Sequence, residues 1–457
     1  MILLNFLITL KHFLEMSNFL KLYRFYFFLT LIFLSTNSCS VLKVDKNNVV
    51  TQRITVKGNQ FFKGDNPYYF IGSNYWYGPL IASKKSGDRR RLIRELNIMK
   101  RYGIDNLRIL VGSEGSGGEY QVKPTLQYEQ GKYNEDLLDG LDFLLSEMKK
   151  RDMYAVLYLT NNWIWSGGMS AYLEWNGYGK TPNPFKQEYS WEDYMNFTSQ
   201  FVQCTPCKES FYSHIKFILK RKNRYNNENY NDDATIMSWQ VANEPRIMGS
   251  ISNEDYYSSW LSETTFLIRS LSKNQLISTG AEGKASYFNN IEVFEHLHNS
   301  QSIDYLTMHM WPKNWSWYDP NNESKSTLNS IEKGLKYMNE HIEISNKLNK
   351  PIVMSEFGFP REKESLSKNS SVKNRNLFFQ EIIEQVVISK KDDGSLAGLN
   401  FWGFGGIAKN NPNKIYWSLG DDFTADPPQE PQGLNTVFAR DKSTLELIKK
   451  GNELLIK

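Results

Sequence analysis

The sequence has few cysteines, no strong charge of either sign, and no apolar run long enough to cross a membrane comfortably. Its 457 residues include three cysteines, and no second pair of ligands stands near them at a spacing that would hold zinc. The formal net charge is +4 and the basic residues are dispersed, so neither nucleic acid nor an acidic substrate is indicated. No internal repeat interrupts the chain. A neutral polymer is compatible as a partner, and no cofactor or metal is expected.

Length and composition fit one large globular domain. The chain is 40% hydrophobic and 23% charged, which is ordinary for a soluble fold with a large core. One barrel domain accounts for this length, and we expect a monomer.

The N-terminal residues read as an export signal. Lys21–Arg24 precede the apolar run Phe25–Leu34, and small or polar residues lead to Cys39. Cys39 resembles the lipid-accepting cysteine of a bacterial lipoprotein, which would place the protein in the periplasm or at the cell surface. Plain secretion and a retained anchor are the alternatives, and Met16 is an alternative start. We expect a signal segment at 1–39 and a flexible tether at 40–51.

Two cysteines form a C-x-x-C pair at Cys204 and Cys207. In a cytosolic thioredoxin-like context this spacing indicates redox catalysis. In an exported chain the oxidising compartment favours a local disulfide that closes the loop.

Eight apolar runs alternate with helical patterns along the chain. Residues such as Leu137, Leu141 and Leu144 recur at helical spacing between the runs. The runs are 68–74, 106–111, 154–160, 236–242, 275–279, 304–310, 351–355 and 399–404. This alternation predicts an α/β fold, a (β/α)8 TIM barrel in a single domain at 52–457, with active-site groups at the strand ends. The longest connection, 161–207, is aromatic and predicts a functional loop.

Two of these runs end in a glutamate. The run 236–242 is followed by Asn243-Glu244-Pro245, and the run 351–355 is followed by Glu356. A carboxyl at the end of a buried strand is costly unless it is paired or has a task. Taken alone, Glu244 could be a structural ion pair with Arg246. Together, the two acids supply the proton donor and the ionised carboxylate that glycosidic bond cleavage requires.

These residues resemble a known family. Asn243-Glu244-Pro245 with Ser355-Glu356-Phe357-Gly358 is similar to the retaining β-glycosidases of glycoside hydrolase family 5. Asn161-Asn162-Trp163 with Gly167–Met169, and Trp311–Trp315, resemble its endo-β-1,4-mannanase branch. The resemblance covers nearly all of the chain after Ile54. It implies cleavage of mannan, glucomannan or galactomannan by double displacement, with carboxyl groups ~5 to 5.5 Å apart.

The resemblance also implies residue roles. Glu244 would be the acid/base and Glu356 the nucleophile. Arg108 would keep the nucleophile ionised, although it could equally be a salt-bridge partner at the bottom of the barrel. Asn243 would contact the 2-hydroxyl of the sugar. His309 would orient a carboxylate or a sugar hydroxyl, and its alternative is a buried core histidine.

Five further residues at strand ends would contact substrate. Trp402 would form the floor beneath the reacting sugar. Trp76, Asn162 and Trp163 follow the first and third runs. Trp311 departs from the family pattern, because many members carry a tyrosine there, and an indole N–H can only donate.

Aromatic residues crowd two loops. They are Trp163, Trp165, Tyr172, Trp175 and Tyr178 in one loop, and Trp311, Trp315, Trp317 and Tyr318 in the other. Pyranose rings stack on aromatic faces, so these clusters predict sugar subsites, and we expect about half of them to cap the core instead. The alternative functions are a β-1,4-glucanase or exo-β-mannosidase of the same clan, and a non-catalytic glycan-binding lipoprotein.

Overall fold

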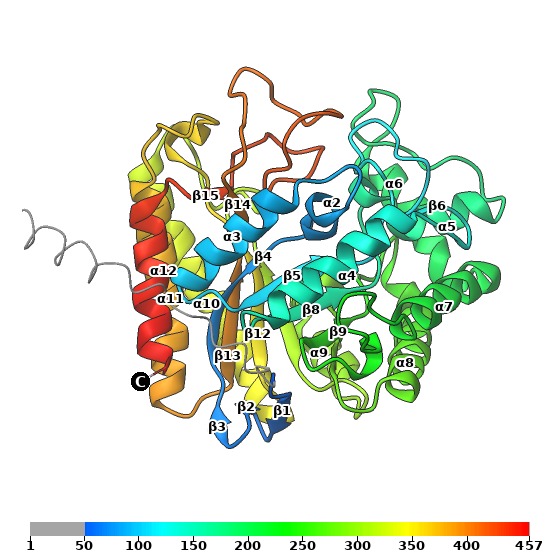
Figure 1. Ribbon diagram of the computed structural model, residues 1–457, viewed down its shortest axis with the longest axis horizontal. Helices are drawn as coiled ribbons and strands as arrows, with labels where there is room; N and C mark the ends of the chain where they lie inside the picture. Colours follow the sequence, from blue (N-terminus) through cyan, green and yellow to red (C-terminus); the bar gives the residue numbers. More distant parts are fainter. Residues whose placement is uncertain (1–50, 457) are drawn as a thin grey trace, which may run out of the picture. The chain divides into compact units, whose positions relative to one another are not determined.

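The structure is a computed structural model that describes residues 51–456, and an eight-stranded parallel sheet lies at its centre (Figure 1). All eight predicted strands are present. They are β4 (Phe70–Asn74), β5 (Asn106–Leu110), β8 (Tyr154–Tyr158), β9 (Ile236–Gln240), β10 (Leu276–Ser278), β11 (Leu306–Met310), β12 (Ile352–Phe357) and β13 (Leu396–Phe401). Every residue in these strands is buried, as expected for parallel strands covered by helices on one side and packed core on the other.

The sheet curls into a barrel. Its neighbours run in the order β10-β9-β8-β5-β4-β13-β12-β11. No ladder joins the outermost pair, β10 and β11, but backbone hydrogen bonds cross between their ends. Asp304 N donates to Ile277 O at 2.8 Å, and His309 N donates to Glu282 O at 3.1 Å. The predicted (β/α)8 TIM barrel is confirmed.

A helix follows each barrel strand. In chain order these helices are α3 (Arg89–Arg101), α4 (Glu135–Lys149), α7 (Thr205–Leu219), α8 (Glu254–Leu271), α9 (Ile291–His298), α10 (Glu323–Leu348), α11 (Lys373–Lys391) and α12 (Lys442–Ile456). The leucines predicted to share a helix face lie in α4, where Leu137, Leu141 and Leu144 are buried. None of the helices in the described part of the chain has the length and hydropathy of a membrane span.

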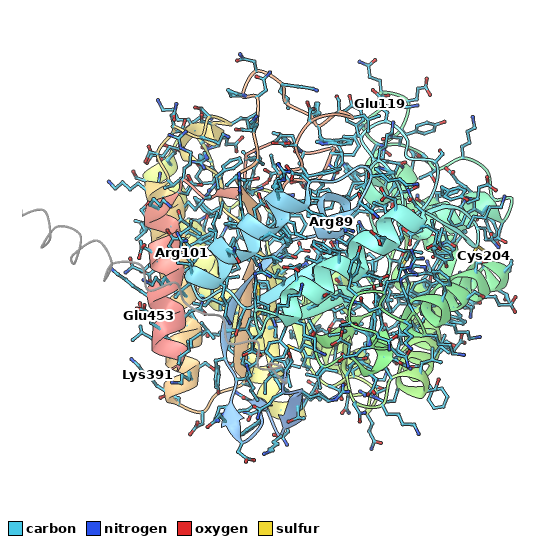
Figure 2. The ribbon with its side chains drawn as sticks, viewed as in Figure 1. Arg89, Arg101, Glu119, Cys204, Lys391 and Glu453 are labelled. Atoms are coloured by element: carbon cyan, nitrogen blue, oxygen red, sulfur yellow. A yellow bond between two sulfur atoms is a disulfide. The ribbon has the colours of Figure 1, made fainter. Side chains whose placement is uncertain are left out.

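Shorter elements lie in the connections. They are α2 (Gly78–Ala82), α5 (Gly168–Trp175), α6 (Trp191–Thr198), and the small sheets β1–β3 (Ile54–Lys57, Gln60–Lys63, Asn66–Pro67), β6–β7 (Gln127–Glu129, Lys132–Tyr133) and β14–β15 (Phe404–Gly406, Val437–Phe438). In Figure 1, β1–β3 lie at one end of the barrel and the long loops gather at the other end. Figure 2 labels Glu119 at the loop end and Lys391 toward the opposite end.

The ends of two strands differ from the ends predicted from the sequence. β13 runs from Leu396 to Phe401, so Trp402 follows the strand instead of lying within it. β12 continues through Glu356 to Phe357, beyond the predicted end at Ser355. The predicted signal segment 1–39, with Cys39, lies outside the described residues, as does the tether up to residue 50.

Candidate active site

A cavity of about 410 Å³ opens at the carboxyl ends of the barrel strands. Residues from the connections after five strands, and one residue within a sixth strand, line it. They are Trp163, Ile164, Trp165, Phe185 and Trp191 after β8; Asn243, Glu244 and Arg246 after β9; Glu282 after β10; Trp311, Asn314 and Trp315 after β11; Glu356 in β12; and Trp402, Pro427, Gln429 and Glu430 after β13. Both predicted glutamates therefore share one cavity, at the end of the barrel where such folds place their chemistry.

Glu244 is held in an uncommon backbone conformation. Its φ is +50°, in the left-handed region that residues with a side chain rarely adopt. Its N–H donates to Gly280 O at 3.0 Å, and Gly280 itself has φ +80°. A Cβ at Gly280 would lie 2.0 Å from Ala242 O, so only glycine allows this close approach. The end of β10 thus fixes the turn that aims Glu244.

Glu356 reaches the cavity from a β-bulge. Met308 pairs with Met354, and the next residue of β11, His309, pairs with Glu356. Ser355 is therefore an extra residue in β12. Bulges re-aim side chains and are common beside active sites. One carboxylate oxygen of Glu356 and one of Glu244 lie within 4.8 Å of each other.

Arg108 connects the polar side chains beneath the cavity. It forms a salt bridge with Glu356 and is itself fully buried in β5. Its other contacts are to Oδ1 of Asn243 at 2.9 Å, Oδ1 of Asn74 at 3.1 Å and Oε1 of Gln240 at 2.7 Å. Arg108 thus lies at the nucleophile end of the barrel, and not at the bottom.

His309 contacts both glutamates. Its Nδ1 lies 2.7 Å from Oε1 of Glu244 and 3.4 Å from Oε2 of Glu356. Its Nε2 lies 2.9 Å from the Ser355 hydroxyl. Burial lowers the pKa of His309 to about 4, against the hydrogen bond and charge of Glu244. The imidazole is therefore neutral at neutral pH.

The two glutamates hold one proton between them over an interval of pH, because two carboxylates this close repel each other. Burial raises the pKa of Glu356, the charge of Glu244 raises it further, and Arg108 opposes both. Burial also disfavours a charged Glu244, whereas His309, Arg246 and Trp163 lower its pKa. The charge of His309 is absent above about pH 4, since its imidazole is then neutral. The permanent charge of Arg108 is in direct contact with Glu356, so we place the negative charge there and the proton on Glu244.

The structure brings most of the predicted substrate-contact residues to the cavity. Asn243, Trp163, Trp311 and Trp402 all line it. The Trp163 indole N–H donates to Oε2 of Glu244. Trp311 packs edge-on against Trp402, with ring centroids 5.7 Å apart. Within residues 51–456 the buried Trp402 N–H has no hydrogen-bond partner.

Two predicted contacts lie elsewhere. Trp76 is buried and does not line the cavity, and its indole N–H donates to Ala425 O at 2.7 Å. Asn162 also does not line the main cavity: its side chain faces a separate small void beside Met248. The alternative interpretation of Glu244, a structural ion pair with Arg246, is not what the structure contains, since Arg246 forms its salt bridge with Glu282.

Sequence reasoning missed the carboxyl of Glu430. It lies in a proline-rich loop after β13, together with Gln429 and Pro427, and it lines the same cavity as the two glutamates. Burial raises the pKa of Glu430 to about 8, with the charges of Asp426 and Glu244 adding to the effect. The sequence does contain one signal for Glu430, which is the position of its loop. The connection after the last strand of a barrel also reaches the end of the barrel that carries the active site.

The aromatic clusters divide between cavity and core. Trp163, Trp165, Trp311 and Trp315 line the cavity. The remaining members do not: Tyr172 and Tyr318 are buried in the core, Trp175 and Trp317 pack against it, and Tyr178 is exposed.

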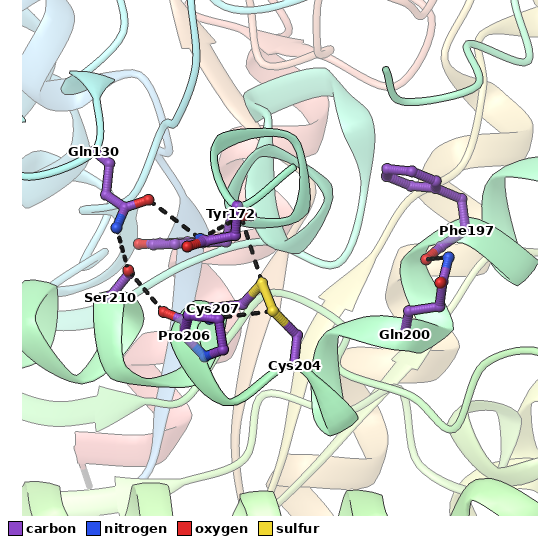
Figure 3. The surroundings of a disulfide bond; sticks show 9 residues. Gln130, Tyr172, Phe197, Gln200, Cys204, Pro206, Cys207 and Ser210 are labelled. Carbon is purple, nitrogen blue, oxygen red and sulfur yellow. Dashed lines mark hydrogen bonds between the residues drawn. A yellow bond between two sulfur atoms is a disulfide. The ribbon is translucent and has the colours of Figure 1, made fainter. Parts of the chain in front are cut away.

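Cys204 and Cys207 are joined by a disulfide at the start of α7 (Figure 3). Both cysteines are buried, and Sγ of Cys207 lies 3.5 Å from Tyr172 O in α5. The bridge therefore lies between two elements of the long connection after β8, away from the cavity.

One group of potential metal ligands exists within residues 51–456: Glu244, His309 and Glu356. The Arg108 cation is already bound to this group, which disfavours a second cation in the same place.

A barrel with two facing carboxyls in an aromatic cavity defines a glycoside hydrolase. Residues 51–457 match the family described as "GH family 5 beta-mannosidase-like". The chain belongs to this family.

Individual relatives agree with this assignment. The chain is 29% identical to mannan endo-1,4-beta-mannosidase 7 of Arabidopsis thaliana over 361 residues, which is 76% of this chain and 77% of that protein. The structure is similar to a glycoside hydrolase family 5 mannosidase from Rhizomucor miehei, with a TM-score of 0.82, 30% identity, and coverage of 89% of this chain and 98% of that one. An endo-1,4-beta-mannanase from the same fungus shares the fold, with a TM-score of 0.62, 21% identity, and coverage of 89% and 99%.

Proposed function

We propose that this protein cleaves β-1,4-mannosidic bonds inside mannan, glucomannan or galactomannan, with retention of anomeric configuration. The observation that carries the proposal is the placement of Glu244 and Glu356, whose carboxylate oxygens approach within 4.8 Å in one cavity. Retaining enzymes hold their carboxyl groups about 5 to 5.5 Å apart, whereas inverting enzymes leave about 6.5 to 9.5 Å for a water molecule. Curated relatives that are mannan endo-1,4-beta-mannosidases support the choice of sugar.

In the first step a carboxylate oxygen of Glu356 attacks the anomeric carbon while the glycosidic C–O bond breaks. Glu244 gives its proton to the leaving oxygen, so the departing sugar carries a hydroxyl. Arg108 keeps Glu356 ionised until the attack. Asn243, held by Arg108, faces the cavity and supplies a partner for the sugar 2-hydroxyl.

In the second step Glu244, now a carboxylate, takes a proton from water as the water attacks the anomeric carbon. The bond to Glu356 breaks, and Glu356 regains its negative charge beside Arg108. His309 and Trp163 both contact Glu244, and they hold its carboxyl in place through both steps.

The test is hydrolysis of linear mannan, galactomannan and carboxymethyl cellulose by the chain from Ser40 onward, beside the variant Glu356→Ala. We expect mixed manno-oligosaccharides from the mannans, and a fall in kcat of about 10⁴-fold or more in the variant. Preferential cleavage of cellulose would favour a β-1,4-glucanase. Mannan binding without turnover of any polymer would favour the glycan-capturing lipoprotein.

A second candidate is an exo-β-mannosidase. The family description names β-mannosidases, and the Rhizomucor miehei mannosidase is 30% identical with a TM-score of 0.82. That mannosidase has also been solved in complex with mannosyl-fructose. One side of the cavity is formed by Pro427, Gln429 and Glu430. A wall at this place would limit the length of the mannan chain that fits.

Product analysis on mannohexaose separates the two candidates. An endo-acting enzyme releases oligosaccharides of several lengths at the earliest times, whereas an exo-acting enzyme releases mannose alone. Mannose as the sole early product would replace the endo proposal with the exo one.

We also propose that the protein is exported and attached to a membrane through a lipid on Cys39. The support is the signal pattern of residues 21–39 and the disulfide of Cys204 with Cys207, since such bonds persist in oxidising compartments. Metabolic labelling with a fatty acid tests it: we expect label in the full chain and none in Cys39→Ala.

A further inference from the structure

The bulge in β12 brings two consecutive residues to the same histidine. Strand side chains normally alternate between faces, so neighbours do not reach one partner. Here both Ser355 and Glu356 approach His309, Ser355 at Nε2 and Glu356 at Nδ1. The pairing confirms the extra residue on both sides of β12, because Met354 pairs with Leu399 and Phe357 with Phe401.

The surroundings of His309 select one tautomer. Its Nδ1 faces oxygens of Glu244 and Glu356, at least one of which is ionised at neutral pH. Arg108 and Arg246 are the other charged groups that act on this ring, and both disfavour its protonation. The ring is therefore neutral and carries its one hydrogen on Nδ1, where it donates to carboxylate oxygen.

Nε2 is then an acceptor, and the Ser355 hydroxyl is its donor at 2.9 Å. Within residues 51–456 this hydroxyl has no other hydrogen-bond partner, and Ser355 is 1% exposed. A buried hydroxyl with a single partner donates to it when that partner is a lone pair.

We propose that Ser355 is a positioning residue that holds His309 in the Nδ1–H tautomer, and that this keeps the proton of Glu244 off the oxygen that contacts His309. The proposal rests on the proposed role of Glu244 as the acid/base. With Nδ1 as donor, Oε1 of Glu244 is an acceptor, and the acidic proton stays on Oε2, where a remaining lone pair accepts from the Trp163 indole N–H. In the other tautomer the Nδ1 lone pair would take the Glu244 proton into a hydrogen bond, away from the leaving oxygen.

The first experiment reads the tautomer directly from the ¹⁵N chemical shifts of histidines in selectively labelled enzyme, with His309→Asn used for assignment. His298 and His341 are internal standards, because their Nδ1 atoms each lie 2.7 Å from a backbone carbonyl to which they donate. We expect the Nδ1–H pattern for His309, and conversion to Nε2–H in Ser355→Ala. An Nε2–H pattern in the unmodified enzyme overturns the proposal, and this reading does not depend on any activity.

The second experiment compares two substrates. For mannotetraose, whose leaving oxygen needs the Glu244 proton, we expect Ser355→Ala to lower kcat/KM roughly 10- to 100-fold, the range seen when an orienting partner is lost. For 2,4-dinitrophenyl β-mannobioside, whose leaving group departs without a proton, we expect a change within about twofold. Equal losses on both substrates would reduce Ser355 to a structural role and overturn the proposal.

Two variants complete the design. Ser355→Thr keeps the hydroxyl and should restore the mannotetraose rate. Ser395→Ala is the matched control, because Ser395 is equally buried and its hydroxyl has no hydrogen-bond partner in the described chain. If the unmodified enzyme cleaves neither substrate, the proposed function fails, while the tautomer reading still decides the role of Ser355.

Discussion

One guanidinium connects four polar side chains at the site. Arg108 reaches Glu356, Asn243, Asn74 and Gln240 from the middle of β5. Its planar fork makes these contacts at fixed angles, which a lysine ammonium cannot reproduce. Loss of the fork would release Asn243 and weaken the ionised state of Glu356 together.

We predict that Arg108→Lys lowers kcat/KM about 10²- to 10³-fold, the loss typical of removing a preorganised charge contact. The charge remains but its contact is poorer, so the pKa of Glu356 rises. The acidic limb of the pH profile of kcat/KM should therefore move to higher pH. A variant with reduced rate and an unmoved acidic limb would show that Arg108 does not control the ionisation of Glu356.

Glu114 is a buried acid outside the cavity. It follows β5, is 1% exposed, and accepts hydrogen bonds from Thr160 Oγ1 at 2.9 Å and Gly168 N at 3.1 Å. Burial raises its pKa to about 8, and these hydrogen bonds act against that rise. Through these two hydrogen bonds, Glu114 holds in place the start of the connection after β8, which includes Trp163.

We predict that this acid makes stability depend on pH. Its folded pKa of about 8 is above the ordinary value of 4.5, so its contribution is complete below about pH 4.5 and is lost as the pH rises through 8. The contribution is at most about 5 kcal/mol. Glu114→Gln, which imitates the protonated acid, should gain thermal stability relative to the unmodified protein between pH 5 and 8. Parallel curves of Tm against pH for the two proteins would contradict this.

Most of the residues that sequence reasoning located stand at the end of an apolar run, and Arg108, in the middle of β5, is an exception. Glu244, Glu356 and His309 follow from that rule, since parallel strands of a barrel deliver their carboxyl ends to one place. Ser355 does not, because a bulge depends on pairing between strands and leaves no mark in the sequence of one strand. Glu430 does not either, since its loop has no periodicity.

At the scale of elements, apolar runs predicted all eight strands because burial on both faces leaves a continuous signal. The ends of two strands, β12 and β13, differ from the predicted ends. The predicted run 399–404 includes Trp402, because an apolar residue fits the pattern of a buried strand. In the structure Trp402 follows β13 and lines the cavity. Apolar side chains that contact a ligand and those that pack in the core look alike in a sequence, and this is why Trp76 was also predicted to contact substrate.

The disulfide at the start of α7 joins two cysteines that are three residues apart, so it constrains only a short segment of the chain. Cys204 is the N-cap of the helix, and its sulfur accepts from the N–H of Cys207 at 3.2 Å. Because the bridge closes so short a loop, we predict that Cys204→Ser with Cys207→Ser costs at most about 2 kcal/mol of unfolding free energy. Activity should persist, since neither cysteine lines the cavity. Thermal unfolding and mannan hydrolysis measure both; loss of turnover in a folded variant would show that the bridge supports the site.

At the scale of the molecule, the cavity belongs to no single segment. Its walls come from the connections after five strands and from Glu356 in β12, and the barrel alone brings them together. Two of these connections, those after β8 and β13, also touch the loop after β5 through a rim cluster of Tyr120, Phe185 and Tyr416. Tyr120 packs against Phe185 at 5.5 Å and against Tyr416 at 5.2 Å between ring centroids. The contacts join the loops after β5, β8 and β13, and Phe185 extends from the cluster into the cavity wall.

We predict that this rim cluster restricts how a long chain enters. Tyr120→Ala with Tyr416→Ala separates the loops, so kcat/KM for polymeric mannan should rise roughly tenfold relative to that for mannotriose, which corresponds to about 1.4 kcal/mol of relieved obstruction. Tyr256→Ala, an exposed tyrosine on α8, is the control and should leave the ratio unchanged. Because short substrates fit within the rim whether it is closed or open, the ratio isolates the effect of the rim from general damage to the site. An unchanged ratio in the double variant would mean that the polymer already passes this side of the cavity freely, and the limit on chain length would then have to come from the wall formed by Pro427, Gln429 and Glu430.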